Sequence, residues 1–238
     1  MGMPGEANVV AVLDRDIDLG EGIPNEQLDR ARQASLASVL TVAPGPWDAP
    51  AAANDGFGLL VLDGLLMRDV SVEGRHAAEV LGPADLLRPW DHDRTDALLP
   101  ATSAWRALGP ARLAVLDARW AVRMAAWPSV GSVLAGRGVM RSRRLVATLA
   151  IIQQPKLDVR LWMLLWDLAE RYGTVHRDGV HLEAPLTHEA LAHLAAARRP
   201  SVSSALSRLA ERGVLKRRRS GWILRGEPPS SDGDLADS

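Results

Sequence analysis

The segment from Leu186 to Gly226 constrains the fold more than any other part of the chain. It holds nine lysine and arginine residues against two acidic ones, whereas the whole chain of 238 residues carries a formal net charge of -1. A solvated helix face does not need such an imbalance, but a surface that meets a polyanion does. The basic segment therefore indicates a nucleic-acid-binding module near the C-terminus, and on charge alone a soluble helical domain is an equal alternative.

The pattern inside this segment predicts two short helices joined by a tight turn. Thr187 can cap the first helix, Pro200 fits the N1 position of the second, and Gly213 fits the position just past its end. The buried stripe of the second helix is expected to consist of Val202, Ala205, Leu206 and Leu209. Its opposite face is small and polar, which suits a helix that enters the major groove.

The sequence VLKRRRSGWIL follows the second helix. Apolar residues flank a turn expected at Ser220-Gly221, which predicts a β-hairpin with a basic tip. A helix-turn-helix followed by such a hairpin is a winged-helix arrangement.

These residues resemble the C-terminal DNA-binding domain of the cyclic-AMP receptor protein/FNR (Crp/Fnr) superfamily of bacterial transcription regulators. The family's recognition helix usually opens Arg-Glu-Thr-Val-Ser-Arg, and the equivalent run here is RPSVSS, residues 199–204. The resemblance implies that Arg199 contacts a base edge. Pro200 and Ser204 replace the family's glutamate and second arginine, so the DNA sequence recognised is expected to differ from the best-known operators.

The residues expected to contact DNA lie on the two helices and on the wing. Hydroxyl groups are expected to bond phosphate oxygens, as are the wing arginines. The full set is Thr187, Arg198, Arg199, Pro200, Ser201, Ser203, Ser204, Arg208, Arg217 and Arg218.

The resemblance implies an α+β fold: an N-terminal antiparallel β-roll of the cyclic-nucleotide-binding or cupin-like type, a long dimerisation helix, and a C-terminal winged helix-turn-helix. The expected divisions are an N-terminal arm and helix (1–36), the roll (37–127), the dimerisation helix (128–154), the DNA-binding domain (155–226) and an acidic flexible tail (227–238). Within the roll, Asp63-Gly64 predicts a hairpin between strands 57–62 and 65–70. A strand through Leu81, a turn at residues 82–85 and a last strand at 111–117 follow.

After Pro128, an apolar stripe at helical spacing predicts a helix that pairs with a second copy of the chain, although a core helix is the alternative. The stripe consists of Val130, Val133, Leu134, Leu145, Leu149 and Ile152. Gly136 and Gly138 weaken the helix by about 1 kcal/mol each relative to alanine, and Pro155 marks a hinge. A homodimer would place two recognition helices about 34 Å apart and require an inverted-repeat operator.

The family's cyclic-nucleotide pocket uses a Gly-Glu pair and an Arg-Ser/Thr-Ala run, and the corresponding region here lacks the Gly-Glu pair. Thr102-Ser103-Ala104 keeps the end of the phosphate run without its arginine, and Arg88 and Arg94 are the alternative cations. Cysteine is absent, which excludes iron–sulfur clusters and thiolate zinc sites. We therefore expect no cofactor and no control by cyclic AMP. Haem through His76 or His92, a tryptophan cage and an untypical small ligand remain alternatives.

Other classes of function are less consistent with the sequence. Asp91, His92, Asp93 and Asp96 suggest a solvated loop, and no phosphate loop, nucleophile elbow or metal-ligand motif occurs, so an enzyme is not expected. A protein-interaction module with an acidic partner is an alternative. The N-terminus lacks a signal-peptide pattern and no apolar run approaches about 20 residues, which predicts a cytoplasmic protein without a membrane span. Double-stranded DNA and a second copy are the expected partners, and RNA polymerase is left open.

Overall fold

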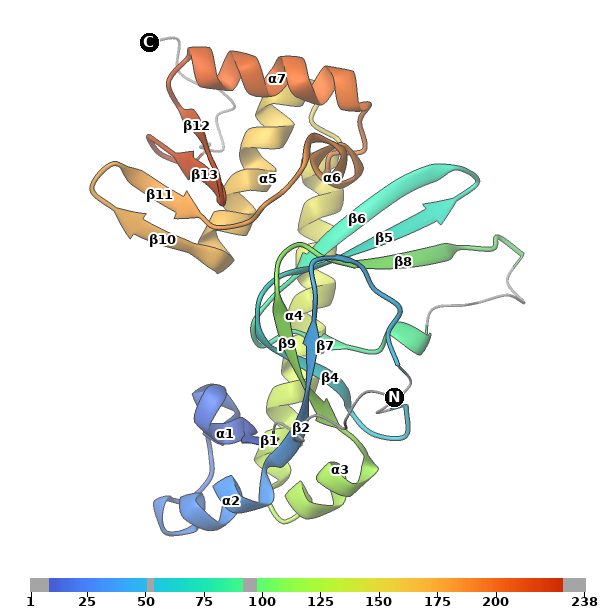
Figure 1. Cartoon of the computed structure of the whole chain (residues 1–238), viewed down its shortest axis with the longest axis vertical. Helices are drawn as coiled ribbons and strands as arrows, with labels where there is room; N and C mark the ends of the chain where they lie inside the picture. The colour runs from blue at the N-terminus through green and yellow to red at the C-terminus, as the bar shows by residue number, and fades with distance from the viewer. Residues whose placement is uncertain (1–8, 51–53, 92–97, 229–238) are drawn as a thin grey trace, which may run out of the picture. The chain divides into compact units, whose positions relative to one another are not determined.

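The computed structural model describes residues 9–50, 54–91 and 98–228, and the chain divides into two compact units (Figure 1). The N-terminal unit comprises Met1–Arg68 and Leu81–Arg143, and the C-terminal unit comprises Asp69–Val80 and Arg144–Ser238. Among the described residues, no helix is long and apolar enough to cross a membrane.

Two antiparallel sheets form the roll. The first has the order β1-β2-β9-β4-β7, with bounds Val9–Ala11, Leu36–Val42, Ala111–Leu116, Gly58–Asp63 and Leu86–Leu87. The second has the order β3-β8-β5-β6, with bounds Gly45–Pro46, Thr102–Ala107, Leu66–Val72 and Arg75–Leu81. The expected α+β fold with an antiparallel roll, a long helix and a C-terminal helix-turn-helix is confirmed.

Short helices cover the first sheet and build the core of the N-terminal unit. They are α1 (Val12–Arg15), α2 (Leu28–Ala34) and α3 (Ala118–Met124), with 3₁₀ turns at Ile17–Gly20, Asn25–Gln27 and Pro89–Asp91. Trp120 of α3 is fully buried, and its Nε1–H donates to the carbonyl oxygen of Ser35 at 3.0 Å. Phe57 lies edge-on to this indole, with 5.8 Å between ring centroids. The indole thus fills the core without an unpaired donor.

The hairpin predicted at Asp63-Gly64 is wrong. β4 pairs with β9 and β7, whereas β5 lies between β8 and β6 in the other sheet. Gly64 does have a positive φ of 86°, and a Cβ there would lie 2.4 Å from the carbonyl oxygen of Pro110. The dipeptide therefore signals a turn conformation, but the turn carries the chain from one sheet to the other.

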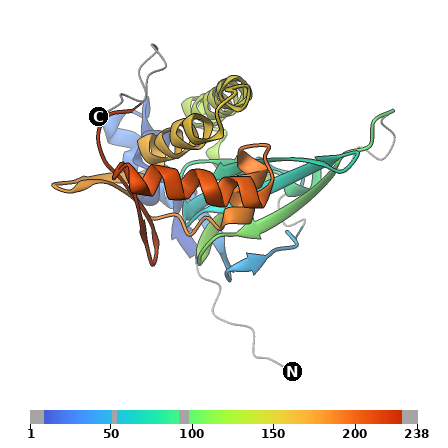
Figure 2. The same cartoon turned by 90° about the horizontal axis from the view of Figure 1, so that it is seen from above.

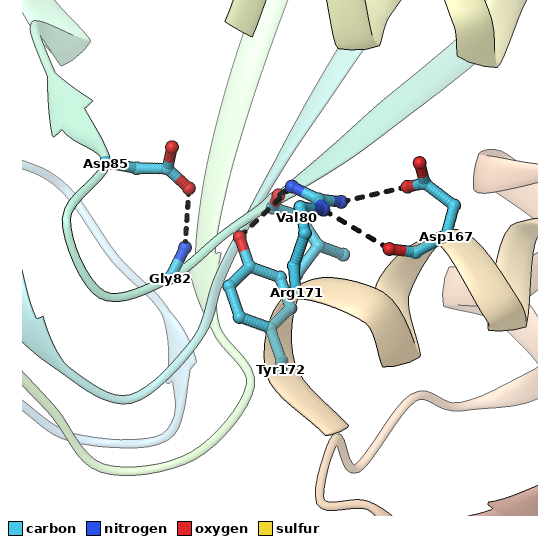
Figure 3. Close-up of polar contacts among 6 residues, drawn as sticks. All are labelled: Val80, Gly82, Asp85, Asp167, Arg171 and Tyr172. Carbon is cyan, nitrogen blue, oxygen red and sulfur yellow. Dashed lines mark hydrogen bonds and ion pairs between the residues drawn. The ribbon is translucent and has the colours of Figure 1, made fainter. Parts of the chain in front are cut away.

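The later strand and turn predictions in the roll are confirmed. β6 ends at Leu81, and in the turn that follows the Gly82 N–H donates to Asp85 Oδ2 at 3.0 Å (Figure 3). The Asp85 N–H donates to the carbonyl oxygen of Gly82, also at 3.0 Å. The last strand of the roll is β9, as expected for residues 111–117.

The long helix α4 spans Pro128–Ile152, close to its predicted extent, but its apolar residues do not form one uniform stripe. Val130 and Leu134 are buried in the core of the N-terminal unit. Leu145 and Leu149 are 40% and 56% exposed. The first half of the predicted pairing stripe is therefore used within the chain, and only the second half presents an apolar face to solvent.

Besides Asp69–Val80 and the end of α4, the C-terminal unit contains α5 (Leu157–Tyr172), α6 (His188–Leu194), α7 (Arg199–Glu211) and a four-stranded sheet. The sheet has the order β10-β11-β13-β12, with bounds Gly173–His176, Gly179–Leu182, Gly221–Leu224 and Leu215–Arg218. Figure 1 shows α7 crossing the end of α5. The hairpin β10–β11 was not predicted, although Asp178-Gly179 is a turn signal and Gly179 has a φ of 133°.

Candidate nucleic-acid interface

The first helix of the helix-turn-helix begins where the sequence predicts. Thr187 is the N-cap of α6, and its Oγ1 accepts the backbone N–H of Ala190 at 3.1 Å. Leu191 and Leu194 turn inward and are buried. The capping bond leaves Thr187 itself exposed at the outer end of the helix.

The turn between α6 and α7 contains no glycine, and a neighbouring helix holds it. Ala196 has a φ of 47°, which is uncommon for a residue with a side chain. Arg160 of α5 donates from Nη1 to the carbonyl oxygen of Ala195 at 2.8 Å and from Nη2 to that of Gln154 at 2.7 Å. Arg160 therefore fixes the geometry of the turn between α6 and α7 by a hydrogen bond from α5.

The second helix, α7, has the expected stop and buried face, and it starts one residue earlier than expected. Arg199 is its first residue and Pro200 its second, one position later than predicted. A backbone N–H in the first turn has no acceptor within the helix, so the N–H that proline lacks costs no hydrogen bond there. Gly213 has a φ of 73° just past the end. Figure 2, which looks down on α7, shows this helix in front of α5. The predicted stripe of Val202, Ala205, Leu206 and Leu209 is buried.

Four of the predicted residues meet around one hollow of about 580 Å³ between the start of α6, α7 and the wing. They are Thr187, Arg199, Ser203 and Arg217. The hollow is open to solvent, and its wall offers two guanidinium groups and three hydroxyl groups, the third from Ser207. These donors match the phosphate oxygens and base edges of a nucleic acid.

The wing arginines are oriented by contacts within the unit. The guanidinium of Arg217 lies 4.4 Å from the ring centroid of Trp222, and Nη1 donates to the carbonyl oxygen of Leu186 at 3.5 Å. Arg218 Nη1 lies 3.0 Å from Nδ1 of His181. Residues 218 and 221 pair, so the wing turns at Arg219-Ser220, one residue before the predicted position.

His188 belongs to the hollow, although the sequence did not suggest it. A hydrogen bond of 2.8 Å joins its Nδ1 to Oγ of Ser203. Partial burial, together with the positive charges of Arg217 and Arg199, lowers the pKa of His188 below its ordinary value. The imidazole is therefore neutral at neutral pH and positions Ser203. His188 directly follows the capping Thr187 in the sequence, and this neighbour is the one sequence feature that could have indicated its position at the hollow.

The remaining predicted residues are more scattered. Arg198, Pro200, Ser201 and Ser204 are exposed at the start of α7, and Ser204 Oγ donates to the carbonyl oxygen of Pro200 at 3.3 Å. Arg208 Nε lies 3.7 Å from Asp158 Oδ2 of α5. Its position favours a role in holding α7 on α5.

The residues considered for an effector in the roll are only partly described. Arg88 donates to the carbonyl oxygens of Gly56 at 2.5 Å and Asn54 at 3.1 Å, so its guanidinium holds a loop. Thr102, Ser103 and Ala104 lie on β8. The predictions that concern His92, Asp93, Arg94 and Asp96, and most of the acidic tail, lie outside the described residues.

Residues 159–226 match the family of Crp-like helix-turn-helix domains. This match begins in α5 and ends just after β13, so it contains every residue of the hollow. No curated protein matches the sequence.

Several solved structures have a similar fold. FixK2 from Bradyrhizobium japonicum is 17% identical, with 85% of this chain and 99% of that chain covered and a TM-score of 0.60. The c-di-GMP responsive global regulator CLP from Xanthomonas campestris is 17% identical, with 86% and 100% covered and a TM-score of 0.56. A CRP-family transcriptional regulator from Thermus thermophilus is 19% identical, with 78% and 91% covered and a TM-score of 0.54.

Proposed function

We propose that this chain, which has a Crp-like helix-turn-helix domain and the fold of the Crp/Fnr superfamily, is a sequence-specific transcription regulator that binds an inverted-repeat operator as a homodimer. The observation that carries the proposal is the hollow at which Thr187, Arg199, Ser203 and Arg217 meet. These groups come from α6, α7 and the wing, the elements with which winged helices contact the grooves and the backbone of DNA. RNA polymerase is the further partner that a promoter-bound regulator would meet.

The exposed half of α4 supports the homodimer. Val139, Leu145, Val146 and Leu149 are each at least 40% exposed, and their spacing places them on one side of the helix. Gly138 belongs to the same side, and a Cβ added there would meet nothing within 4 Å. An apolar stripe of this kind with small residues beside it suits close packing against an identical helix.

Selection of bound duplexes from a random library tests the proposal directly. We expect the selected sequences to converge on an inverted repeat whose half-sites are one helical turn apart. A selection that recovered random duplex, or an affinity that depended only on total charge, would favour the alternative of an interaction module for acidic partners.

Arg217 is expected to contact the DNA backbone and not a base. Arg217→Gln removes one cation from the wing, so it should weaken binding to all sequences alike and reduce the slope of log affinity against log salt by about 1. Titrations of the selected operator and of a random duplex at several salt concentrations measure both effects. Arg30→Gln, an exposed arginine of α2, is the matched control. A loss confined to the operator would contradict the assignment.

Control by cyclic AMP is not part of the proposed function. A ligand shifts the DNA-competent state only by its difference in affinity between the two states. The roll lacks the phosphate arginine, and Arg88 is engaged by backbone carbonyls. Without a fixed cation a buried cyclic phosphate would lose its charge-assisted hydrogen bonds.

We therefore expect neither cyclic AMP nor cyclic GMP to change operator affinity. Calorimetry with each nucleotide, run beside a DNA titration, measures this. A micromolar dissociation constant together with a tenfold change in operator affinity would show that another cation replaces the missing arginine.

A further inference from the structure

A cluster of two histidines and one aspartate lies outside the hollow and has no part in the proposed DNA contacts. Asp69 is on β5, His76 on β6 and His193 in the last turn of α6. All three residues belong to the C-terminal unit. The sequence suggests His76 only as a haem ligand, because no local pattern links it with His193.

Both imidazole rings turn the same nitrogen toward one carboxylate. Nδ1 of His76 lies 2.9 Å from Oδ1 of Asp69. Nδ1 of His193 forms a hydrogen bond with the other oxygen, Oδ2. The two rings stack, with 4.6 Å between centroids and an interplanar angle of 14°. The side chains are partly accessible, so an ion from solvent can reach them.

We propose that Asp69, His76 and His193 bind a divalent transition-metal ion of the zinc class. Among the residues that the structure describes, this is the one group of three such side chains whose ligand atoms all lie within 4.8 Å of one another. Two imidazole nitrogens and a carboxylate oxygen are ligands that Zn²⁺ accepts at about 2.0–2.2 Å. Small side-chain rotations bring these atoms to that distance, and water completes the coordination.

The ion takes the place of the hydrogen-bonded protons between the nitrogens and the carboxylate. Each ring then carries its proton on Nε2, and the carboxylate of Asp69 neutralises part of the charge of the ion. The site joins the hairpin of β5 and β6 to α6. The same hairpin is held by Arg171 of α5, whose Nη1 donates to the carbonyl oxygen of Val80 at 3.4 Å (Figure 3). The hairpin that carries Asp69 and His76 therefore already has a partner in the unit.

Arg171 is itself held in place. Its Nη2 lies 3.2 Å from Oδ2 of Asp167, and its Nη1 lies 3.1 Å from the hydroxyl oxygen of Tyr172. These contacts hold the Arg171 guanidinium in place without any metal. The metal proposal can thus be tested by variants that leave this anchor intact.

The test is a competition titration of the full chain with Zn²⁺ against a chromophoric chelator, repeated with Co²⁺ to record its visible absorption. We expect one ion per chain in the wild type. His193→Ala and Asp69→Asn should each lower the zinc affinity at least tenfold. Loss of a group that only orients a metal ligand already costs about 10–100-fold in affinity, and loss of the ligand itself should cost no less. The Co²⁺ band should be lost in parallel.

A second histidine pair in the same unit provides the matched control. His176 and His181 stack with 3.9 Å between centroids, and His181 Nε2 lies 2.7 Å from Asp178 Oδ1. His176 is not one of the three clustered ligands, so His176→Ala should leave zinc affinity unchanged. Zinc binding in the wild type that is no tighter than in His193→Ala, or an equal loss in His176→Ala, would overturn the proposal. Asp69→Asn keeps the size of the side chain, so its result stands even if His193→Ala folds poorly.

Discussion

A chain that carries Val146→Glu and Leu149→Glu together is expected to be a monomer with about 10²–10⁴-fold lower affinity for the symmetric operator. Both side chains are more than half exposed on the second half of α4. Two carboxylates on this face would place like charges against each other across a helix pair, and a monomer loses the gain in effective concentration that the second half-site provides. Analytical ultracentrifugation and a DNA titration measure the two effects.

The control for this variant is Val122→Glu. Val122 is 75% exposed and lies on another helix, α3. It should leave both the oligomeric state and the DNA affinity unchanged. If the double variant of α4 remained dimeric, the pairing surface would have to lie elsewhere.

Arg199→Ala is expected to cost about 1–3 kcal/mol of operator binding and to relax specificity at one position in each half-site. Arg199 is the first residue of α7 and lies on the wall of the hollow, exposed to solvent. An arginine there can donate two hydrogen bonds to a guanine edge. Arg199→Ala should therefore lower the affinity for the operator more than the affinity for random duplex, whereas Arg217→Gln should lower both alike.

Competition between operator variants, one base pair changed at a time, measures the loss of specificity. Arg30→Ala removes the same charge from α2 and serves as the control. If Arg199→Ala left both affinity and base preference unchanged, the placement of α7 as the recognition helix would be wrong.

The sequence predicts the helix-turn-helix of the C-terminal unit well because its signals are local. Thr187 caps α6, Gly213 ends α7, and the stripe from Val202 to Leu209 is buried as its spacing requires. Each of these features depends on residues within one or two turns of the chain. The family resemblance and the charge pattern indicate three of the four predicted residues at the hollow, which are Arg199, Ser203 and Arg217.

Features that depend on distant partners could not be predicted in the same way. Asp63-Gly64 fixes a turn but does not determine which sheet receives the next strand. The stripe on α4 does not show that Val130 and Leu134 are covered by the chain's own core. The pairing of His188 with Ser203, and the meeting of Asp69 with His193, require two segments to be brought together by the fold.

The spacing between half-sites provides the most direct test of a dimeric, sequence-specific regulator. Fluorescence anisotropy would compare the selected operator with one in which five base pairs are inserted at its centre, which turns one half-site to the opposite face of the duplex. The proposed homodimer predicts that the affinity falls to that of a single half-site, since both recognition helices cannot engage at once. An unchanged affinity for the lengthened operator would contradict the proposed function.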